Sequence, residues 1–201
     1  MDYRALFMRK LYWNRIKFLK IASTLLAQIK FKLWGIPFGK KLHVIGRIIV
    51  FRNPESVIQI GDYCIFNSSS KLNFRGINHP CILQTGTKHA RITIGDHVEM
   101  SGCSIVCNDS VIIGNNVLFG ANCQIGDRDG HQDRYASKPA PIIIEDGVWL
   151  GMNVTVLKGV TIGKNSIIGA NSIVTKDIPA FCIAAGNPCI VIKEQQQNRT
   201  I

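Results

Sequence analysis

Six successive hexads decide the fold of this chain: residues 142–177 read IIIEDG, VWLGMN, VTVLKG, VTIGKN, SIIGAN and SIVTKD. Each hexad carries a branched aliphatic side chain at its third position, and Gly or Asn recurs near the turn that follows. An α-helix has 3.6 residues per turn, so a period of six would spread these side chains around its surface. A chain of short strands and turns instead points all of them inward, because Gly and Asn accept the positive φ of tight corners.

The same aliphatic column continues upstream of these hexads. Its members form three runs: Ile60, Phe66 and Leu72; Ile94, Met100 and Val106; and, after a slip of one residue, Ile113, Phe119 and Ile125. Three hexads close one triangular coil, and stacked coils pair through parallel backbone hydrogen bonds around a dry core. We therefore predict an all-β fold, a single parallel β-helix of about five triangular coils preceded by an N-terminal α-helical segment. The alternative is a β-sandwich, which rarely keeps so strict a period.

Length and composition are those of one folded domain. The chain has 201 residues, of which 46% are hydrophobic and 18% charged, and this excludes wholesale disorder. Its seven Cys are odd in number and scattered, and none forms the C-x-x-C spacing of zinc or redox motifs. We interpret them as buried free thiols, which are typical of a reducing, cytoplasmic setting.

Positive charge is concentrated at the N-terminal end. Residues 1–41 hold ten Lys and Arg against one acid, whereas residues 42–201 hold fourteen against twelve. We predict a basic amphipathic helical segment over 1–41, a β-helix domain over 42–193 with a loop insert at 127–141, and a polar tail over 194–201. No recognised nucleic-acid module accompanies the basic charge, so we predict no nucleic-acid partner.

The N-terminal segment has the pattern of an amphipathic helix without the length of a membrane span. Apolar residues near helical spacing are Leu6, Phe7, Leu11, Ile16 and Leu19, with Trp13 and Phe18 beside them. The longest uncharged run, Ile21–Ile29, has nine residues, whereas a transmembrane helix needs about 20. One interpretation of residues 1–34 is an interfacial helix at the inner face of an anionic membrane. The alternative is a helix packed on the body or on a neighbouring subunit.

The strongest resemblance to a known family lies in residues 148–193, which read VWLGMNVTVLKGVTIGKNSIIGANSIVTKDIPAFCIAAGNPCIVIK. This segment resembles the C-terminal coils of hexapeptide-repeat acyltransferases, in the branch of galactoside, maltose and surface-polysaccharide O-acetyltransferases. Residues 78–83 (NHPCIL) and 90–102 (ARITIGDHVEMSG) are similar to bacterial sugar acyltransferases of capsule and lipopolysaccharide pathways. The resemblance implies a left-handed β-helix, assembly as a homotrimer and acetyl-CoA as the co-substrate.

A polar insert interrupts the repeat once in its C-terminal half, at residues 126–141 (GDRDGHQDRYASKPAP). It contains Asp127, Asp129 and His131, and by the resemblance His131 stands where relatives carry their catalytic His. An imidazole, whose ordinary pKa is about 6.5, can take the proton of a sugar hydroxyl as that hydroxyl attacks a thioester. We predict His131 as the general base and Asp129 as the residue that fixes its tautomer, with no covalent acyl-enzyme.

By the same resemblance, coenzyme A lies in a groove between adjacent β-helices. The residues that would contact it are Trp149, Gly151, Met152, Ala170, Thr175, Lys176 and Lys193. Lys176 and Lys193 supply positive charge for its phosphates. Two positions depart from the family pattern, because Met152 replaces a Ser found in many relatives and Ile190 replaces an Arg found in some. Core or interface packing is the alternative for Trp149, and a terminal turn is the alternative for the segment that holds Lys176.

Two residues are predicted to face the acceptor. His79 lies in an early loop that resembles the polysaccharide-modifying subgroup, and Ser101 lies about where relatives place polar residues near the acceptor. A shaping role in a turn is the alternative for each. No two His have the spacing that the zinc site of β-helix carbonic anhydrases requires, so we predict no metal.

These features together predict an acetyl-CoA-dependent O-acetyltransferase. The acceptor would be a hydroxyl of a sugar or of a surface-polysaccharide precursor, and the enzyme would work in the cytoplasm, at the inner face of the membrane. The alternatives are N-acetylation of an amino sugar and a non-catalytic β-helix scaffold.

Overall fold

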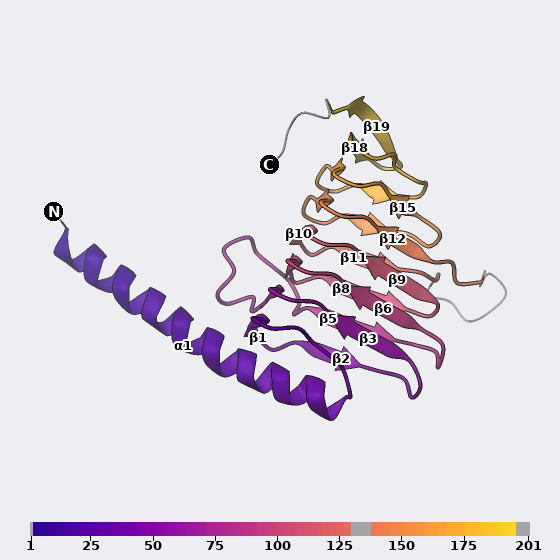
Figure 1. Cartoon of the computed structure of the whole chain (residues 1–201). Coiled ribbons are helices and arrows are strands. Elements are labelled where there is room, and N and C mark those ends of the chain that lie inside the picture. Colours follow the sequence, from indigo (N-terminus) through magenta and orange to yellow (C-terminus); the bar gives the residue numbers. More distant parts are fainter. Residues whose placement is uncertain (1, 130–137, 196–201) are drawn as a thin grey trace.

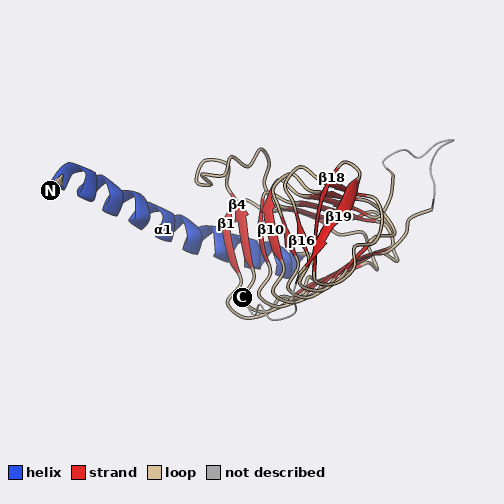
Figure 2. Cartoon of the chain, turned by 90° about the horizontal axis from the view of Figure 1, so that it is seen from above, coloured by secondary structure: helices blue, strands red, loops and turns tan. Residues whose placement is uncertain are grey.

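The computed structural model describes residues 2–129 and 138–195 (Figure 1). They form one helix and three sheets, and the sheets are the three sides of a stack of coils. The helix α1 spans Tyr3–Leu33. Up to β17 the strands rotate through the sheets in order, so that every third strand falls in the same sheet. The chain therefore winds upward as a parallel β-helix, the architecture predicted from the hexads, and Figure 2 shows it from above.

Each side of the coil is one sheet. The first sheet contains, in order, β1 (His43–Gly46), β4 (Ile65–Ser68), β7 (Glu99–Ser101), β10 (Leu118–Ala121), β13 (Trp149–Leu150), β16 (Ile167–Ile168), β18 (Cys182–Gly186) and β19 (Cys189–Glu194). The second contains β2 (Ile49–Phe51), β5 (Ile82–Thr85), β8 (Ser104–Cys107), β11 (Gln124–Gly126), β14 (Thr155–Val156) and β17 (Ile173–Val174). The third contains β3 (Val57–Ile60), β6 (Arg91–Ile94), β9 (Ser110–Ile113), β12 (Ile142–Ile144) and β15 (Thr161–Ile162). All pairs are parallel except β18 with β19.

The described residues form six coils rather than about five. The additional coil is the first, made of β1, β2 and β3. Its buried residues Val50 and Ile58 are eight positions apart, which hides it from a search for a period of six. The sixth coil contains β16 and β17, and a single β-bridge between Ile162 and Ile178 completes its third side. After this coil the chain enters β18, which pairs with β16.

Two predicted members of the aliphatic column are wrong. Leu72 lies in the loop of residues 69–80, and Leu83 in β5 takes the inward position on that side of the coil. Val106 is half-buried on the outside of β8, whereas its neighbour Ile105 is fully buried. The pairing of β10 with β7 contains a register shift, so the spacing changes earlier than the sequence pattern indicates.

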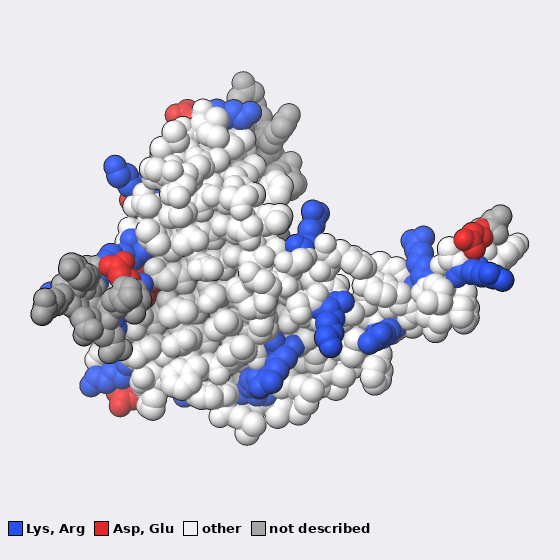
Figure 3. All heavy atoms as spheres, turned by 180° about the vertical axis from the view of Figure 1, so that it is seen from behind, with Lys and Arg blue, Asp and Glu red and all other residues white. Residues whose placement is uncertain are grey.

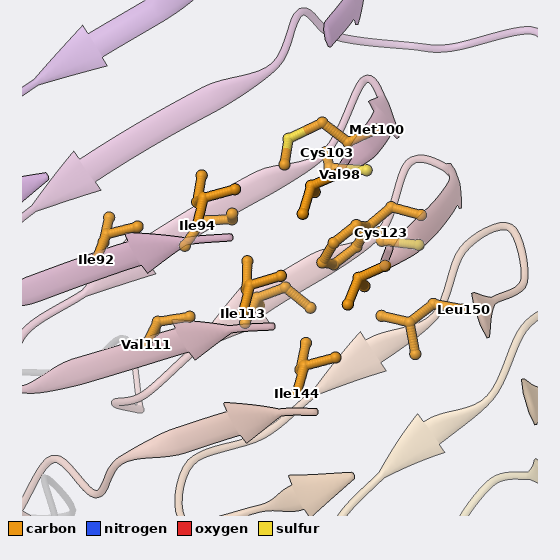
Figure 4. Close-up of a cluster of buried hydrophobic side chains, with 14 of the residues drawn as sticks. Ile92, Ile94, Val98, Met100, Cys103, Val111, Ile113, Cys123, Ile144 and Leu150 are labelled. Carbon is orange, nitrogen blue, oxygen red and sulfur yellow. The ribbon is translucent and has the colours of Figure 1, made fainter. Parts of the chain in front are cut away.

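The inward side chains of the three sheets meet in one continuous core. Figure 4 shows Ile94, Ile113 and Ile144 above one another in successive coils, across from Met100 and Leu150 of the first sheet. All five are at most 1% exposed. Burial of one such side chain stabilises a fold by about 1.5–3 kcal/mol, so this column is the main source of stability. All seven Cys are also buried and free, as predicted.

The C-terminal half of α1 caps the first coil. Thr24 and Phe31 are buried beneath it. The Val44 amide donates to the Thr24 hydroxyl at 3.0 Å, and the Lys30 ammonium donates to the Ile48 carbonyl at 2.7 Å. The helix thus covers the open end of the core and satisfies backbone groups of the first coil, which confirms packing on the body for this half.

The N-terminal half of α1 projects beyond the coils (Figures 1 and 2). The predicted apolar stripe is not a buried face, since Leu6, Phe7 and Phe18 are 51%, 62% and 70% exposed. Tyr12 and Ile16, one helical turn apart, are the half-buried residues in this stretch. Over residues 2–129 and 138–195, no helix combines the length and the hydropathy of a membrane span.

Candidate active site

A groove of about 460 Å³ runs along the outer face of the first sheet, near its corner with the second sheet. We call it the sheet groove, and its lining residues are Arg75, Ser101, Phe119, Gly120, Ala121, Trp149, Gly151, Met152, Ile167, Ile168, Gly169 and Ala170. Four of the predicted coenzyme contacts lie here, namely Trp149, Gly151, Met152 and Ala170. Ser101, predicted on the acceptor side, lies in the same groove, so the structure brings these five residues together.

Close stacking of glycines shapes the floor of the sheet groove. Gly120 and Gly151 occupy the same position in successive coils, and neither has room for a side chain. A Cβ on Gly120 would lie 2.5 Å from the Met152 amide nitrogen, and one on Gly151 would lie 2.6 Å from the Ala170 amide nitrogen. The missing side chains thus let the backbones of successive coils stack closely, and both glycines lie in the lining of the groove. The half-exposed Trp149 adds an aromatic surface beside them.

A ladder of asparagines supports the same corner. Asn122, Asn153 and Asn171 have φ values of 62°, 57° and 60°, the left-handed region that Asn tolerates better than most residues. The Asn153 side-chain amide donates to Asn171 Oδ1 at 2.9 Å, and that of Asn122 donates to Asn153 Oδ1 at 3.4 Å. Asn122 Oδ1 also accepts the Asn78 amide at 3.0 Å, which ties loop 69–80 to the corner. The sequence shows Asn near successive turns but not that their side chains join.

The polar insert leaves from a different corner, between the second and third sheets. Asp127, at its start, is fully buried, and its carboxylate accepts the amides of Asn108 and Asp109, each at 2.7 Å. The Ala140 amide donates to the Asp127 carbonyl at 2.9 Å, and the Gly159 amide donates to the Ala140 carbonyl at 3.1 Å. These bonds hold both ends of the insert at one point of the coil, so Asp127 has a structural role.

The predicted catalytic pair lies only partly within the described residues. Asp129 forms an ion pair with Lys158, which follows β14 in the next coil. His131 lies outside the described residues. The pairing of Asp129 with Lys158 fixes the beginning of the insert against the coil that follows.

Buried thiols near both corners are unsuited to nucleophilic catalysis. Burial raises the pKa of the Cys107 thiol well above its ordinary value, and the adjacent Asp127 carboxylate raises it further. Cys123 is also fully buried, and its thiol donates to the Gly151 carbonyl at 3.2 Å, beneath the sheet groove. A thiolate is the reactive form of Cys, so the raised pKa of Cys107 favours a structural role. For Cys123 access is what is limiting, because its side chain is fully buried.

Three predicted coenzyme contacts do not line the sheet groove. Thr175 and Lys176 follow β17 and are exposed at the corner that also carries the insert. Lys193 is exposed in β19, where it pairs with Ile183 of β18. The predicted site is therefore divided between two corners of the chain.

The two predicted acceptor residues are near neighbours without a shared contact. Ser101 Oγ accepts the Asn67 side-chain amide at 3.4 Å. His79 is half-buried, its Nδ1 lies 2.8 Å from the Pro80 carbonyl, and its own carbonyl abuts Gly102. His79 shapes loop 69–80 and does not line the sheet groove. Arg75 does line it, a residue that sequence reasoning missed because nothing in the sequence places loop 69–80 beside the groove.

The remaining described His residues show no metal site. Within the described ranges, no group of three His, Cys, Asp or Glu side chains could hold a metal ion. His97 instead stacks on Tyr63 at the corner between the third and first sheets, with ring centroids 4.7 Å apart and planes 6° from parallel.

Comparison with known proteins agrees with this architecture. Residues 141–176 match the family described as bacterial transferase hexapeptide (six repeats), and residues 110–126 match the hexapeptide repeat of succinyl-transferase. A galactoside O-acetyltransferase of Lactococcus lactis is 37% identical over 139 residues, 66% of this chain and 61% of the relative. A polysialic acid O-acetyltransferase of Escherichia coli O1:K1 is 42% identical over 115 residues, 53% of this chain and 38% of the relative. The chain thus spans less than two thirds of the length of either.

A solved structure extends the likeness to the fold. An N-acyltransferase from Bacillus cereus, solved with dTDP and 3-hydroxybutyryl-CoA, superposes with a TM-score of 0.66 at 18% identity, covering 85% of this chain and 89% of that one. The fold and the repeats define a hexapeptide-repeat protein with the expected left-handed parallel β-helix. Residues 141–176 carry the repeats of the bacterial transferase hexapeptide family, and the proteins similar to this chain include sugar O-acetyltransferases, as the resemblance of residues 148–193 implies.

Proposed function

We propose that this protein transfers an acetyl group from acetyl-CoA to a hydroxyl of a sugar or surface-polysaccharide precursor in the cytoplasm. The observation that carries the proposal is the sheet groove, which collects Trp149, Gly151, Met152 and Ala170 around stacked glycines. A galactoside and a polysialic acid O-acetyltransferase among the relatives support an O-acetyl product.

The sheet groove suits the pantetheine arm of coenzyme A. That arm is long, narrow and carries two amides, so it needs close access to backbone and an apolar wall. Gly120 and Gly151 line the groove and add no side chain to obstruct it, and Trp149 with Met152 gives the apolar surface. The exposed ammonium of Lys193 would face the phosphates, as point charges commonly do.

In the proposed mechanism, His131 acts as the general base. Its imidazole takes the proton of the acceptor hydroxyl while the hydroxyl oxygen attacks the thioester carbonyl carbon. The tetrahedral intermediate then expels the thiolate of coenzyme A, and the imidazolium returns the proton to that sulfur. Hydrogen-bond donors of the groove would stabilise the oxyanion, with the Ser101 hydroxyl as the side-chain candidate. Asp129 would orient the imidazole, a role that its ion pair with Lys158 supports by fixing the start of the insert.

Replacement of His131 tests this mechanism. His131→Ala should lower kcat by about 10²–10⁴-fold while acetyl-CoA binding, measured by calorimetry, stays within twofold. His89→Ala, an exposed His in the turn before β6, is the matched control and should leave both unchanged. Retention of full turnover by His131→Ala would remove the assignment.

We propose further that three copies assemble as a homotrimer and that each site lies between two of them. The sheet groove and the insert lie at different corners, on either side of the second sheet, so one chain separates the proposed coenzyme site from the proposed base. A neighbouring copy with its insert against the groove would unite them. Light scattering with size-exclusion chromatography should give three times the mass of 22.3 kDa, and a monomeric active enzyme would contradict the proposal.

N-acetylation of an amino sugar is the second candidate reaction. It is supported by the fold likeness to an N-acyltransferase solved with a thymidine nucleotide and an acyl-CoA. Free-thiol release measures turnover with glucose and with glucosamine as acceptors. Treatment of the product with hydroxylamine then separates the two reactions, because hydroxylamine cleaves an ester and leaves an amide intact. No thiol release with any acceptor would instead favour the scaffold alternative.

The projecting half of α1 is proposed to bind the inner face of an anionic membrane. Exposed apolar residues at helical spacing form one outward stripe: Tyr3, Phe7, Leu11, Phe18, Ile21 and Leu25. At 100° per residue, Lys10 and Lys17 flank this stripe on one side and Arg4 and Arg15 on the other. Figure 3 shows basic side chains along α1 and acid only near its N-terminal end. Apolar residues between rows of cations are typical of interfacial helices.

Vesicle binding tests the membrane contact. The variant Phe7→Ser/Leu11→Ser/Phe18→Ser should lose sedimentation with phosphatidylglycerol vesicles. The matched control Ile190→Ser/Ile192→Ser, in exposed apolar residues of β19, should keep it. Neither protein should sediment with neutral phosphatidylcholine, since the cations need anionic headgroups. Equal sedimentation of both variants with anionic vesicles would end this proposal.

A further inference from the structure

A second groove lies between the inner side of α1 and loop 69–80. We call it the helix–loop groove; its volume is about 340 Å³. The helix contributes Trp13 and Ile16, and the loop contributes Leu72, Asn73, Phe74 and Arg75. Ser101 and Arg75 line both this groove and the sheet groove. The two grooves therefore meet at Ser101 and Arg75, and together they form one path along the first sheet.

Aromatic rings form one wall of the helix–loop groove. Phe74 stacks on Tyr12 of the helix, with ring centroids 5.6 Å apart and planes 25° from parallel. Trp13 meets the edge of the same Tyr12 ring at 5.9 Å. Phe74 remains 83% exposed and Trp13 50% exposed, so both present open surface while Tyr12 holds them in place. Flat apolar faces of this kind pack against the C–H faces of sugar rings.

Half of the lining residues are polar, and none is acidic. Asn67, Ser69, Asn73 and Ser101 supply amide and hydroxyl groups that can donate to and accept from sugar hydroxyls. The loop is fixed where it turns, because the Arg75 amide donates to Asn73 Oδ1 at 2.8 Å. The lining is thus rich in the groups that bind carbohydrate and contains no acidic side chain to repel an anion.

Arg75 gives the groove its charge preference. Its side chain is exposed at the junction of the two grooves, and neither ion pair in the described residues involves it. The surrounding N-terminal segment is strongly basic. A guanidinium recognises a carboxylate through two parallel hydrogen bonds, so this position favours an anionic ligand over a neutral one.

We propose that the helix–loop groove binds an acidic, carboxylate-bearing oligosaccharide as the extended part of the acceptor. Arg75 would pair with a carboxylate next to the acetylated sugar at Ser101, and Trp13 and Phe74 would pack against the sugars that follow. The inference rests on the proposed function only for the reaction at Ser101, because the binding itself requires no acetyl transfer.

Binding to the full chain tests the proposal without reference to activity. The probes are a hexamer of galacturonate and the neutral hexamer maltohexaose, each measured by calorimetry at low salt. The galacturonate hexamer should bind at least about tenfold more tightly than maltohexaose, and Arg75→Gln should abolish most of that difference. Arg91→Gln, an exposed Arg in β6 far from both grooves, should leave it unchanged. Trp13→Ala should weaken binding of both hexamers by several-fold.

Three results would overturn the inference. One is equal affinity for the two hexamers, and a second is an unchanged preference in Arg75→Gln. The third is a loss of acetyl-CoA affinity in Arg75→Gln without loss of hexamer affinity, which would assign Arg75 to the coenzyme alone. Binding to phosphatidylglycerol vesicles but to neither hexamer would also be equal affinity for the two hexamers. It would overturn the inference and assign the basic segment to the membrane. Failure of the acetyltransferase itself would appear differently, as hexamer binding with no thiol release.

Discussion

The two corners that border the second sheet are built in opposite ways. The corner with the first sheet is made of Gly and Asn residues, and its backbones stack closely. The sheet groove runs along the outside of this corner. The corner with the third sheet is held by the buried carboxylate of Asp127 and gives rise to the long insert. One corner is regular and would bind the coenzyme under the proposed function, whereas the other is interrupted and would project the proposed base. Under the proposed function, the regular repeat would supply the binding surface and its interruption would supply the catalytic base.

The largest expected effect is at the insert corner. Asp127→Ala should lower the free energy of unfolding by about 3 kcal/mol, because it removes the buried carboxylate that accepts the amides of Asn108 and Asp109. Urea denaturation followed by circular dichroism measures the change. Asp127→Asn keeps one acceptor oxygen and should lose less. A change under about 0.5 kcal/mol for Asp127→Ala would show that the corner does not depend on this carboxylate.

At the groove corner, the next effect should fall on ligand binding rather than stability. Ala170→Trp places a large side chain on an exposed position of the sheet groove and should weaken acetyl-CoA binding by about tenfold to a hundredfold. Ala180→Trp, at an exposed position between the third and first sheets, is the control and should bind normally. If both variants bind acetyl-CoA alike, the sheet groove is not the coenzyme site.

The asparagine ladder gives a smaller effect on stability. Asn153→Ala should cost about 1–2 kcal/mol, since it combines a left-handed φ of 57° with the loss of two side-chain hydrogen bonds. Asn165→Ala has a similar φ of 56° and takes no part in the ladder, so it should cost only the backbone part. Equal losses in the two variants would mean that the ladder adds nothing beyond conformation.

The smallest effect concerns alkaline pH. Burial raises the pKa of Cys64 from 9.0 to about 11, so the folded state keeps its proton where the unfolded state loses it. Stability from this thiol is complete below pH 9 and declines as the pH rises toward about 11. Cys64→Ser should show a shallower decline in unfolding free energy over that range. An unchanged slope would exclude Cys64 as a contributor.

The regular coils could be predicted because strand and turn geometry imposes their period. Ile144, Leu150 and Val156 are buried as the hexads indicate. The period of six does not reveal the first coil, because a longer turn separates Val50 from Ile58. The period also points Val106 inward, because the register shift between β7 and β10 cannot be seen in the sequence. Periodicity reports the core only where successive coils have equal length.

The sequence places several repeat residues together, and their role as coenzyme contacts stays a prediction. Gly151, Met152 and Ala170 follow the hexads, and the groove gathers them as the family resemblance implies. Arg75 and Phe74 could not be found in this way, since their place depends on how loop 69–80 meets α1. The sequence also offers several apolar faces of α1, and only packing decides that Tyr12 and Ile16 turn toward the body.

Subunit complementation tests the central claim, that the groove of one chain and the insert of another make one site. His131→Ala removes the proposed base of the insert, and Ala170→Trp blocks the groove. Each variant alone should have little activity when acetyl-CoA is kept well below the Kd of Ala170→Trp. In a cyclic trimer that contains both chains, one of three interfaces pairs an intact insert with an intact groove, so purified mixed trimers should recover about one third of the wild-type activity. Mixed trimers with no activity above either parent would contradict the account.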